Sequence, residues 1–194
     1  SDSMFRPTRR RVLASLGAIS ASVLLAGHTP YRQWAVLRQR FLLIHTNRED
    51  LGTDTLGERI AAVLAERLPS SRARVVRGPD NYRIGGLLST EQADVAVLSR
   101  AVALALARRE PPFAELPPTE VRVLAESARY QLVCRDSFPR HHGYLVAEAL
   151  AADAAALGIV IPDRAGSTAD PEGALPTHVG ALAFLRGEPL EPPA

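Results

Sequence analysis

The chain has 194 residues, of which 46% are hydrophobic and 23% charged, so it can bury a substantial core. All 23 basic residues are arginines, and seven of them fall within residues 6–40, so the formal net charge of +2 reflects the N-terminal segment. No stretch interleaves basic and aromatic residues as a nucleic-acid stacking platform does, and the single cysteine excludes an internal disulfide.

Residues 8–31 predict a membrane anchor. The segment begins TRRRVL, which resembles a twin-arginine export signal built on Arg9, Arg10 and Arg11. The charge-free run at 12–31 is about twenty residues long, enough for a helix to cross a hydrocarbon core of about 30 Å. Because four arginines precede this run, we expect the N-terminus in the cytoplasm and the C-terminal domain in the periplasm.

Two features favour a retained helix over a cleaved signal. The end of the apolar run lacks the small residues at positions −3 and −1 of a clean cleavage site. Tyr31, Arg32 and Trp34 follow it as an aromatic and basic cluster of the kind that anchors a helix at the membrane interface. We therefore expect a single-pass protein of the inner membrane. The alternatives are a cleaved signal and a buried helix of a soluble protein.

Beyond the anchor and juxtamembrane segment at 1–40, residues 41–188 predict one α/β lobe, followed by a frayed tail at 189–194. Short apolar or alternating runs predict strands at 41–44, 74–77, 94–98, 121–125 and 130–134. Apolar residues at helical spacing predict helices at 56–68, after Asp80, and at 101–109, 144–157 and 179–186. The alternation of strand and helix is typical of a parallel sheet with right-handed βαβ crossovers.

Local signals refine these elements. Thr55 and Glu58 have the spacing of a capping box at the start of the first helix, after a loop at 45–55. Asp80 can cap the second helix. Cys134 alternates with polar Gln131 in its strand, which predicts a buried, unreactive thiol.

Ligands of parallel sheets bind at the carboxyl ends of the strands, beside helix N-termini. The loops at 45–55, 77–81 and 98–100 meet there, so we expect an anion site for a small carboxylate, with arginines as bidentate donors and polar side chains as secondary donors. The candidate ligand-binding residues are Thr46, Asn47, Arg77, Asn81, Arg83, Ser99 and Arg100. The alternative is that these arginines are ordinary surface charges.

The sequence offers little for catalysis. It has no G-x-S-x-G elbow, no phosphate-binding Walker loop and no G-x-G-x-x-G, so we expect no enzyme activity and no cofactor. Asp136, His141, His142 and His178 suggest a metal site, but adjacent histidines point to different sides of the chain. We therefore expect no metal, and a local hydrogen bond for His178.

The order of the segments resembles one lobe of a TAXI-type (TRAP-associated extracytoplasmic) solute-binding protein, within the type II periplasmic-binding fold. The resembling segments are Phe41–Asn47, Gly78–Asn81, Glu91–Leu98, Val121–Val133, Tyr144–Leu150 and Pro176–Leu182. Full members of the family insert a second lobe between the paired strands and the late helix, where this chain has only Asp136–Gly143. They also carry glycines and an aromatic residue after the first strand, where this chain has Arg48–Asp54.

Two functions follow. The retained anchor and the missing lobe favour a non-catalytic accessory or assembly subunit of a membrane protein complex, because a single lobe cannot bury most of a ligand. The resemblance implies the alternative, a solute-binding component of a TRAP-type transporter that recognises a small carboxylate.

Overall fold

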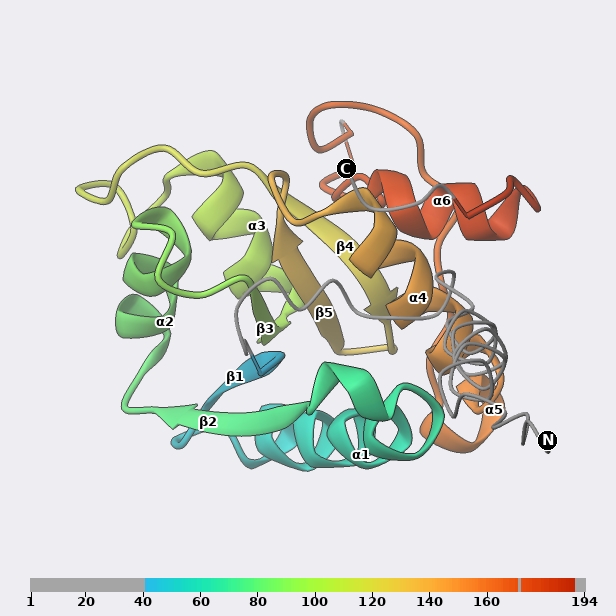
Figure 1. Ribbon diagram of the computed structural model, residues 1–194. Helices are drawn as coiled ribbons and strands as arrows, with labels where there is room; N and C mark the ends of the chain where they lie inside the picture. The colour runs from blue at the N-terminus through green and yellow to red at the C-terminus, as the bar shows by residue number, and fades with distance from the viewer. Residues whose placement is uncertain (1–40, 171, 191–194) are drawn as a thin grey trace, which may run out of the picture. The chain divides into compact units, whose positions relative to one another are not determined.

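The computed structural model describes residues 41–170 and 172–190, and these form a single α/β lobe (Figure 1). The elements in chain order are β1 (Leu43–Asn47), α1 (Leu51–Arg67), the 3-10 helix η2 (Pro69–Ser71), β2 (Arg74–Gly78), α2 (Asn81–Ser89), β3 (Val95–Ser99), α3 (Arg100–Arg108), β4 (Val121–Glu126), β5 (Tyr130–Arg135), α4 (Arg140–Ala151), α5 (Ala154–Leu157) and α6 (Val179–Leu185). The N-terminal anchor and the end of the predicted tail lie outside these residues.

The five strands form one mixed sheet in the order β2-β1-β3-β5-β4. β1 pairs in parallel with β2 and β3, whereas β5 runs antiparallel to both β3 and β4. The prediction of a parallel sheet is therefore wrong for β5. Only residues 127–129 join β4 to β5, and Ser127 N donates to Tyr130 O at 2.8 Å, so the two strands form a hairpin.

Alternating strand residues build a core on each face of the sheet. Along β3, Val95 and Val97 join the core beneath α1 and α4, while Ala96 and Leu98 join the core beneath α2 and α3. Figure 1 shows α2 and α3 together on one side of the sheet, away from α4, α5 and α6. Because both faces are covered, every residue of β4 is buried.

The first strand and helix differ from their predicted bounds. β1 continues through His45, Thr46 and Asn47, which were predicted to lie in a loop, because β1 is held between β2 and β3. α1 then begins at Leu51, capped by Asp50, whose carboxylate accepts a hydrogen bond from Gly52 N at 3.0 Å. The predicted capping box of Thr55 and Glu58 is therefore wrong.

The later elements follow the predictions more closely. The predicted helix 144–157 is two helices, and the first, α4, starts at Arg140, directly after Pro139 and four residues earlier than predicted. Gly85 of α2 packs closely against Phe113: a Cβ there would lie 2.8 Å from Phe113 Cε1, and Phe113 is 1% exposed. Cys134 is buried, as predicted, and burial raises the pKa of its thiol well above the ordinary value.

Candidate functional site

The parallel strands end at one edge of the sheet, which we call the strand-end edge. β1, β2 and β3 end there at Asn47, Gly78 and Ser99, and each is followed by a helix. β4 ends at the same edge with Glu126, and β5 begins there with Tyr130, because Ser99 lies opposite Tyr130 in the pairing. The candidate ligand-binding residues were predicted from the sequence to lie at this edge.

Arg77 is held by carboxylates of α1. Its Nε lies 2.9 Å from the Asp54 carboxylate, and a terminal nitrogen contacts Glu58. Asp54 also accepts a hydrogen bond from buried Thr46, at 3.0 Å. These charges raise the pKa of Arg77, first through the hydrogen bond with Asp54. Thr46 and Arg77 therefore meet at one carboxylate of the chain itself.

Asn47 is the centre of a second group of hydrogen bonds. It is 4% exposed, and its side-chain amide donates to Asn81 Oδ1 at 3.1 Å. Its side-chain oxygen accepts from Glu49 N at 2.9 Å, and its backbone N–H donates to Thr53 Oγ1 at 3.0 Å. The two asparagines that the sequence proposed as ligand donors thus bind one another and the loop between β1 and α1.

Tyr130 closes this group from β5. Its hydroxyl donates to Asp50 Oδ1 at 2.9 Å, the oxygen that also caps α1 through Gly52 N. The hydrogen bond with Asp50 raises the pKa of Tyr130. A Cβ at Gly52 would lie only 2.0 Å from the Tyr130 hydroxyl oxygen, so glycine is needed for this contact. Sequence reasoning missed Asp50 and Tyr130.

The helix N-termini at this edge already have caps from the chain. Asp50 caps α1, and Asp80 caps α2 by accepting from Arg83 N at 2.7 Å, as predicted. Ser99 caps α3 by accepting from Val102 N at 3.3 Å. Two of the three helices therefore have a carboxylate where an incoming anion would bind.

Arg100 belongs to a separate cluster at the end of β4. One of its terminal nitrogens donates to Ser127 O at 3.0 Å and lies 3.3 Å from buried Glu126. Arg164, from the loop before α6, donates to both oxygens of Glu126 at 2.8 and 2.6 Å, and Gln131 Nε2 donates to it at 3.0 Å. Sequence reasoning missed Glu126; the available signal was an acid at the end of a mostly apolar strand.

Burial by itself raises the pKa of Glu126, but hydrogen bonds from Arg164 and Gln131 and the nearby charge of Arg100 lower it to about 2. Glu126 is therefore a carboxylate at neutral pH. Arg77 and Arg100 do not converge on one place, because one pairs with α1 and the other with the end of β4. Arg83 is exposed and forms no ion pair among the described residues.

His178 has a local role in the fold. His178 is fully buried, with Nε2 2.8 Å from Phe138 O, and its Nδ1 accepts from Gly180 N at 3.2 Å, which confirms the predicted local hydrogen bond. Burial lowers its pKa. Within the described part of the chain, no group of three or more His, Cys, Asp or Glu side chains is placed to hold a metal ion.

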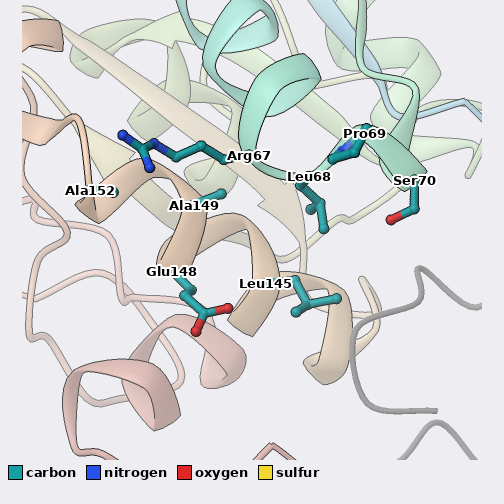
Figure 2. Close-up of a pocket in the computed structure, with 8 residues that line it drawn as sticks. All are labelled: Arg67, Leu68, Pro69, Ser70, Leu145, Glu148, Ala149 and Ala152. Atoms are coloured by element: carbon teal, nitrogen blue, oxygen red, sulfur yellow. The ribbon is translucent and has the colours of Figure 1, made fainter. Parts of the chain in front are cut away.

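Three hollows described by the structure lie at the opposite edge of the sheet, where the parallel strands begin. The first, of about 470 Å³, lies between the end of α1 and α4 (Figure 2). The second, about 270 Å³, lies beside the end of α3 and the start of β4. The third, about 220 Å³, lies beside the end of α2. None of the three is lined by a predicted ligand-binding residue.

The predicted anchor residues Arg9, Arg10, Arg11, Tyr31 and Trp34 lie outside the described residues. In the part of the chain that the structure does describe, no helix combines the length and apolar character needed to cross a membrane. No protein-family model matches the sequence, and a search of curated proteins finds no significant match.

Proposed function

We propose that this chain is a non-catalytic accessory subunit of a membrane protein complex. Residues 8–31 hold it in the inner membrane as a single span, and the lobe at 41–188 faces the periplasm and docks on its partner. The arginines before the apolar run support this orientation, and the aromatic cluster after the run supports a retained span.

One observation carries the proposal: two of the three candidate arginines at the strand-end edge, Arg77 and Arg100, are neutralised by carboxylates of the chain itself. Arg77 pairs with Asp54 and Glu58, and Arg100 pairs with Glu126. A small carboxylate could bind these arginines only by displacing the existing ion pairs. The free energy lost with those pairs would offset much of the free energy of binding. The polar groups at this edge are arranged to hold the lobe together.

The strand-end edge also exposes apolar side chains. Leu51, at the start of α1, is 77% exposed, and Tyr82, in the first turn of α2, is 47% exposed. Val160, which pairs with Glu126 at the end of β4, is 59% exposed. Aromatic and apolar residues at a rim of mixed charge suit a protein partner.

The short connection between β5 and α4 leaves no room for a lobe inserted at this position. Only residues 136–139 separate the two elements. In the TAXI-type family, which the sequence resembles, a second lobe is inserted at this place. We propose that a partner subunit covers the strand-end edge in its stead.

The second candidate function is a solute-binding component of a TRAP-type transporter. It is favoured by Arg83, which is exposed at the start of α2 and has no ion pair among the described residues. A thermal-shift screen with dicarboxylates and amino acids separates the two functions. A ligand at 100 times its Kd stabilises a protein by about 2.7 kcal/mol. The accessory-subunit proposal predicts no stabilisation.

Stabilisation that is lost in Arg83→Gln but kept in Arg72→Gln, an exposed arginine at the other edge, would support the transporter function instead. The anchor is tested separately by carbonate extraction of membranes. We expect the chain to stay in the membrane pellet, and its release into the supernatant would refute the anchor.

A further inference from the structure

The two outermost strands of the sheet differ in how their outer sides are covered. Along β4, Val123 N donates to Pro176 O at 2.9 Å and Glu126 N donates to Val160 O at 2.8 Å, so segments of the lobe itself pair with this strand. β2 is the other outermost strand, and within the described residues it pairs only with β1 (Figure 1). A strand with an unpaired side is a template for a further strand.

The register of β2 shows which of its backbone groups point outward. Arg74 N donates to Leu42 O at 2.9 Å, so the backbone N–H and C=O of Arg74 point toward the chain of β1. The direction alternates along a strand, so the groups of Val76 also point toward β1, whereas those of Val75 and Arg77 point away from it. These four outward groups form no hydrogen bond with any described residue.

We propose that a second copy of this chain pairs with the outer side of β2, as β2 against β2 in antiparallel orientation. Because the outer side of β4 is covered within the lobe, β2 is the strand that each copy offers, and the contact closes as a two-fold dimer. The axis passes through Val76, whose two side chains meet across it. The outward groups of Val75 then pair with those of Arg77 of the other copy, which forms four hydrogen bonds between the strands.

This register suits the charges along β2. Arginines often protect an open strand against pairing. Here the two-fold axis places Arg74 opposite Gly78 of the other copy, which has no side chain to meet it. The charge of Arg77 is already paired with Asp54, 2.9 Å away, and with Glu58. Arg77 therefore gives an acidic strand little to bind, and it does not oppose a second copy.

The dimer goes beyond the proposed function and does not depend on it. The proposed membrane partner covers the ends of the strands, whereas the dimer extends the sheet sideways from β2. A chain that copurifies with no membrane protein, or that is released by carbonate, would leave the dimer standing.

Val75→Pro tests the pairing without breaking the contact between β2 and β1. Proline removes the outward N–H of residue 75, and proline is accepted in an outer strand where its nitrogen faces solvent. The control Val75→Thr keeps this N–H and the branched shape of the side chain. Light scattering of the full chain in mild detergent measures the protein mass. We expect the mass of two chains for wild type and Val75→Thr, and of one chain for Val75→Pro.

Disulfide formation is a second, independent measurement, since native Cys134 is buried. Two Cα atoms at a non-hydrogen-bonded antiparallel pair lie about 4.5 Å apart, which suits a disulfide, so Val76→Cys should form a covalent dimer on oxidation. The matched control is Arg74→Cys, an exposed position on the same face of β2. Its two copies lie roughly 14 Å apart in this register and should not join.

Circular dichroism checks that both variants at residue 75 are folded, and if Val75→Pro is not, the disulfide pair decides alone. A wild-type chain that is monomeric would overturn the proposal. A folded Val75→Pro that remains dimeric, or equal disulfide yields from Val76→Cys and Arg74→Cys, would also overturn it.

Discussion

Replacing Glu126 by glutamine removes a buried carboxylate and keeps its shape. Glu126 accepts two hydrogen bonds from Arg164 and one from Gln131, and it lies 3.3 Å from Arg100. Arg164 belongs to the segment between α5 and α6, and it also donates to Leu175 O at 2.9 Å. The substitution therefore loosens the attachment of this segment to the end of β4.

The magnitude follows from the pKa of Glu126, which is held at about 2 against an ordinary value of 4.5. This difference corresponds to at most about 3 kcal/mol of stability at neutral pH. The Arg164 and Arg100 side chains are 25% and 43% exposed, so solvent screening reduces the contribution, and we expect about 1–2 kcal/mol. Because the folded state has the lower pKa, the contribution is complete above pH 4.5 and is lost as the pH falls toward 2.

Urea unfolding followed by circular dichroism at pH 7 and pH 3 measures this effect. We expect Glu126→Gln to be less stable than wild type at pH 7, and the difference to shrink at pH 3. The matched control is Glu58→Gln, which removes an exposed carboxylate that pairs with Arg77 and should have little effect. Equal stability of Glu126→Gln and wild type at pH 7, or a difference that does not change with pH, would refute the reasoning.

Three further predictions concern the rest of the lobe. Gly85→Ala should lower the free energy of unfolding by about 1–3 kcal/mol, because its Cβ would crowd Phe113, whereas Gly86→Ala, whose nearest neighbour lies 3.9 Å away, should not; equal melting temperatures would contradict this. Tyr130→Phe should cost about 1 kcal/mol in urea unfolding through the lost hydrogen bond to Asp50, and an unchanged midpoint would argue against that bond. Three histidines have pKa values that burial lowers below 6.5, and they are His45, His142 and His178. Because the unfolded chain binds more protons below pH 6.5, the melting temperature should fall between pH 7 and pH 5, and a rise over that range would count against these assignments.

Local sequence signals predicted most of the elements. Asp80 caps α2 as its position indicates, and apolar alternation identified all five strands. The first strand was placed too early, because His45, Thr46 and Asn47 are polar and read as a loop. Asn47 and Thr46 are buried with partners outside the strand: Asn47 binds Asn81 of α2, and Thr46 binds Asp54 of α1. Tertiary contacts of this kind override local propensity.

The sequence predicted that the candidate residues lie at the strand-end edge, but it did not predict their hydrogen-bond and ion-pair partners. The strand-end edge follows from the order of strands and helices, so the positions of Asn47 and Asn81 were foreseeable. The partners of the arginines were not, because Glu126 lies 38 residues from Arg164, and no local spacing joins them. The prediction of a parallel sheet was wrong for β5. Two successive apolar runs predict two strands, but their sequence pattern does not distinguish a hairpin from two strands of a parallel sheet.

The central claim is that the strand-end edge docks on a membrane partner, and affinity purification of the tagged chain from inner membranes in mild detergent tests it most directly. We predict that an integral membrane protein copurifies in stoichiometric amount, and that it is lost in Tyr82→Glu but kept in Thr90→Glu, an exposed position at the opposite edge. Purification of the wild-type chain without a stoichiometric membrane protein would contradict the account.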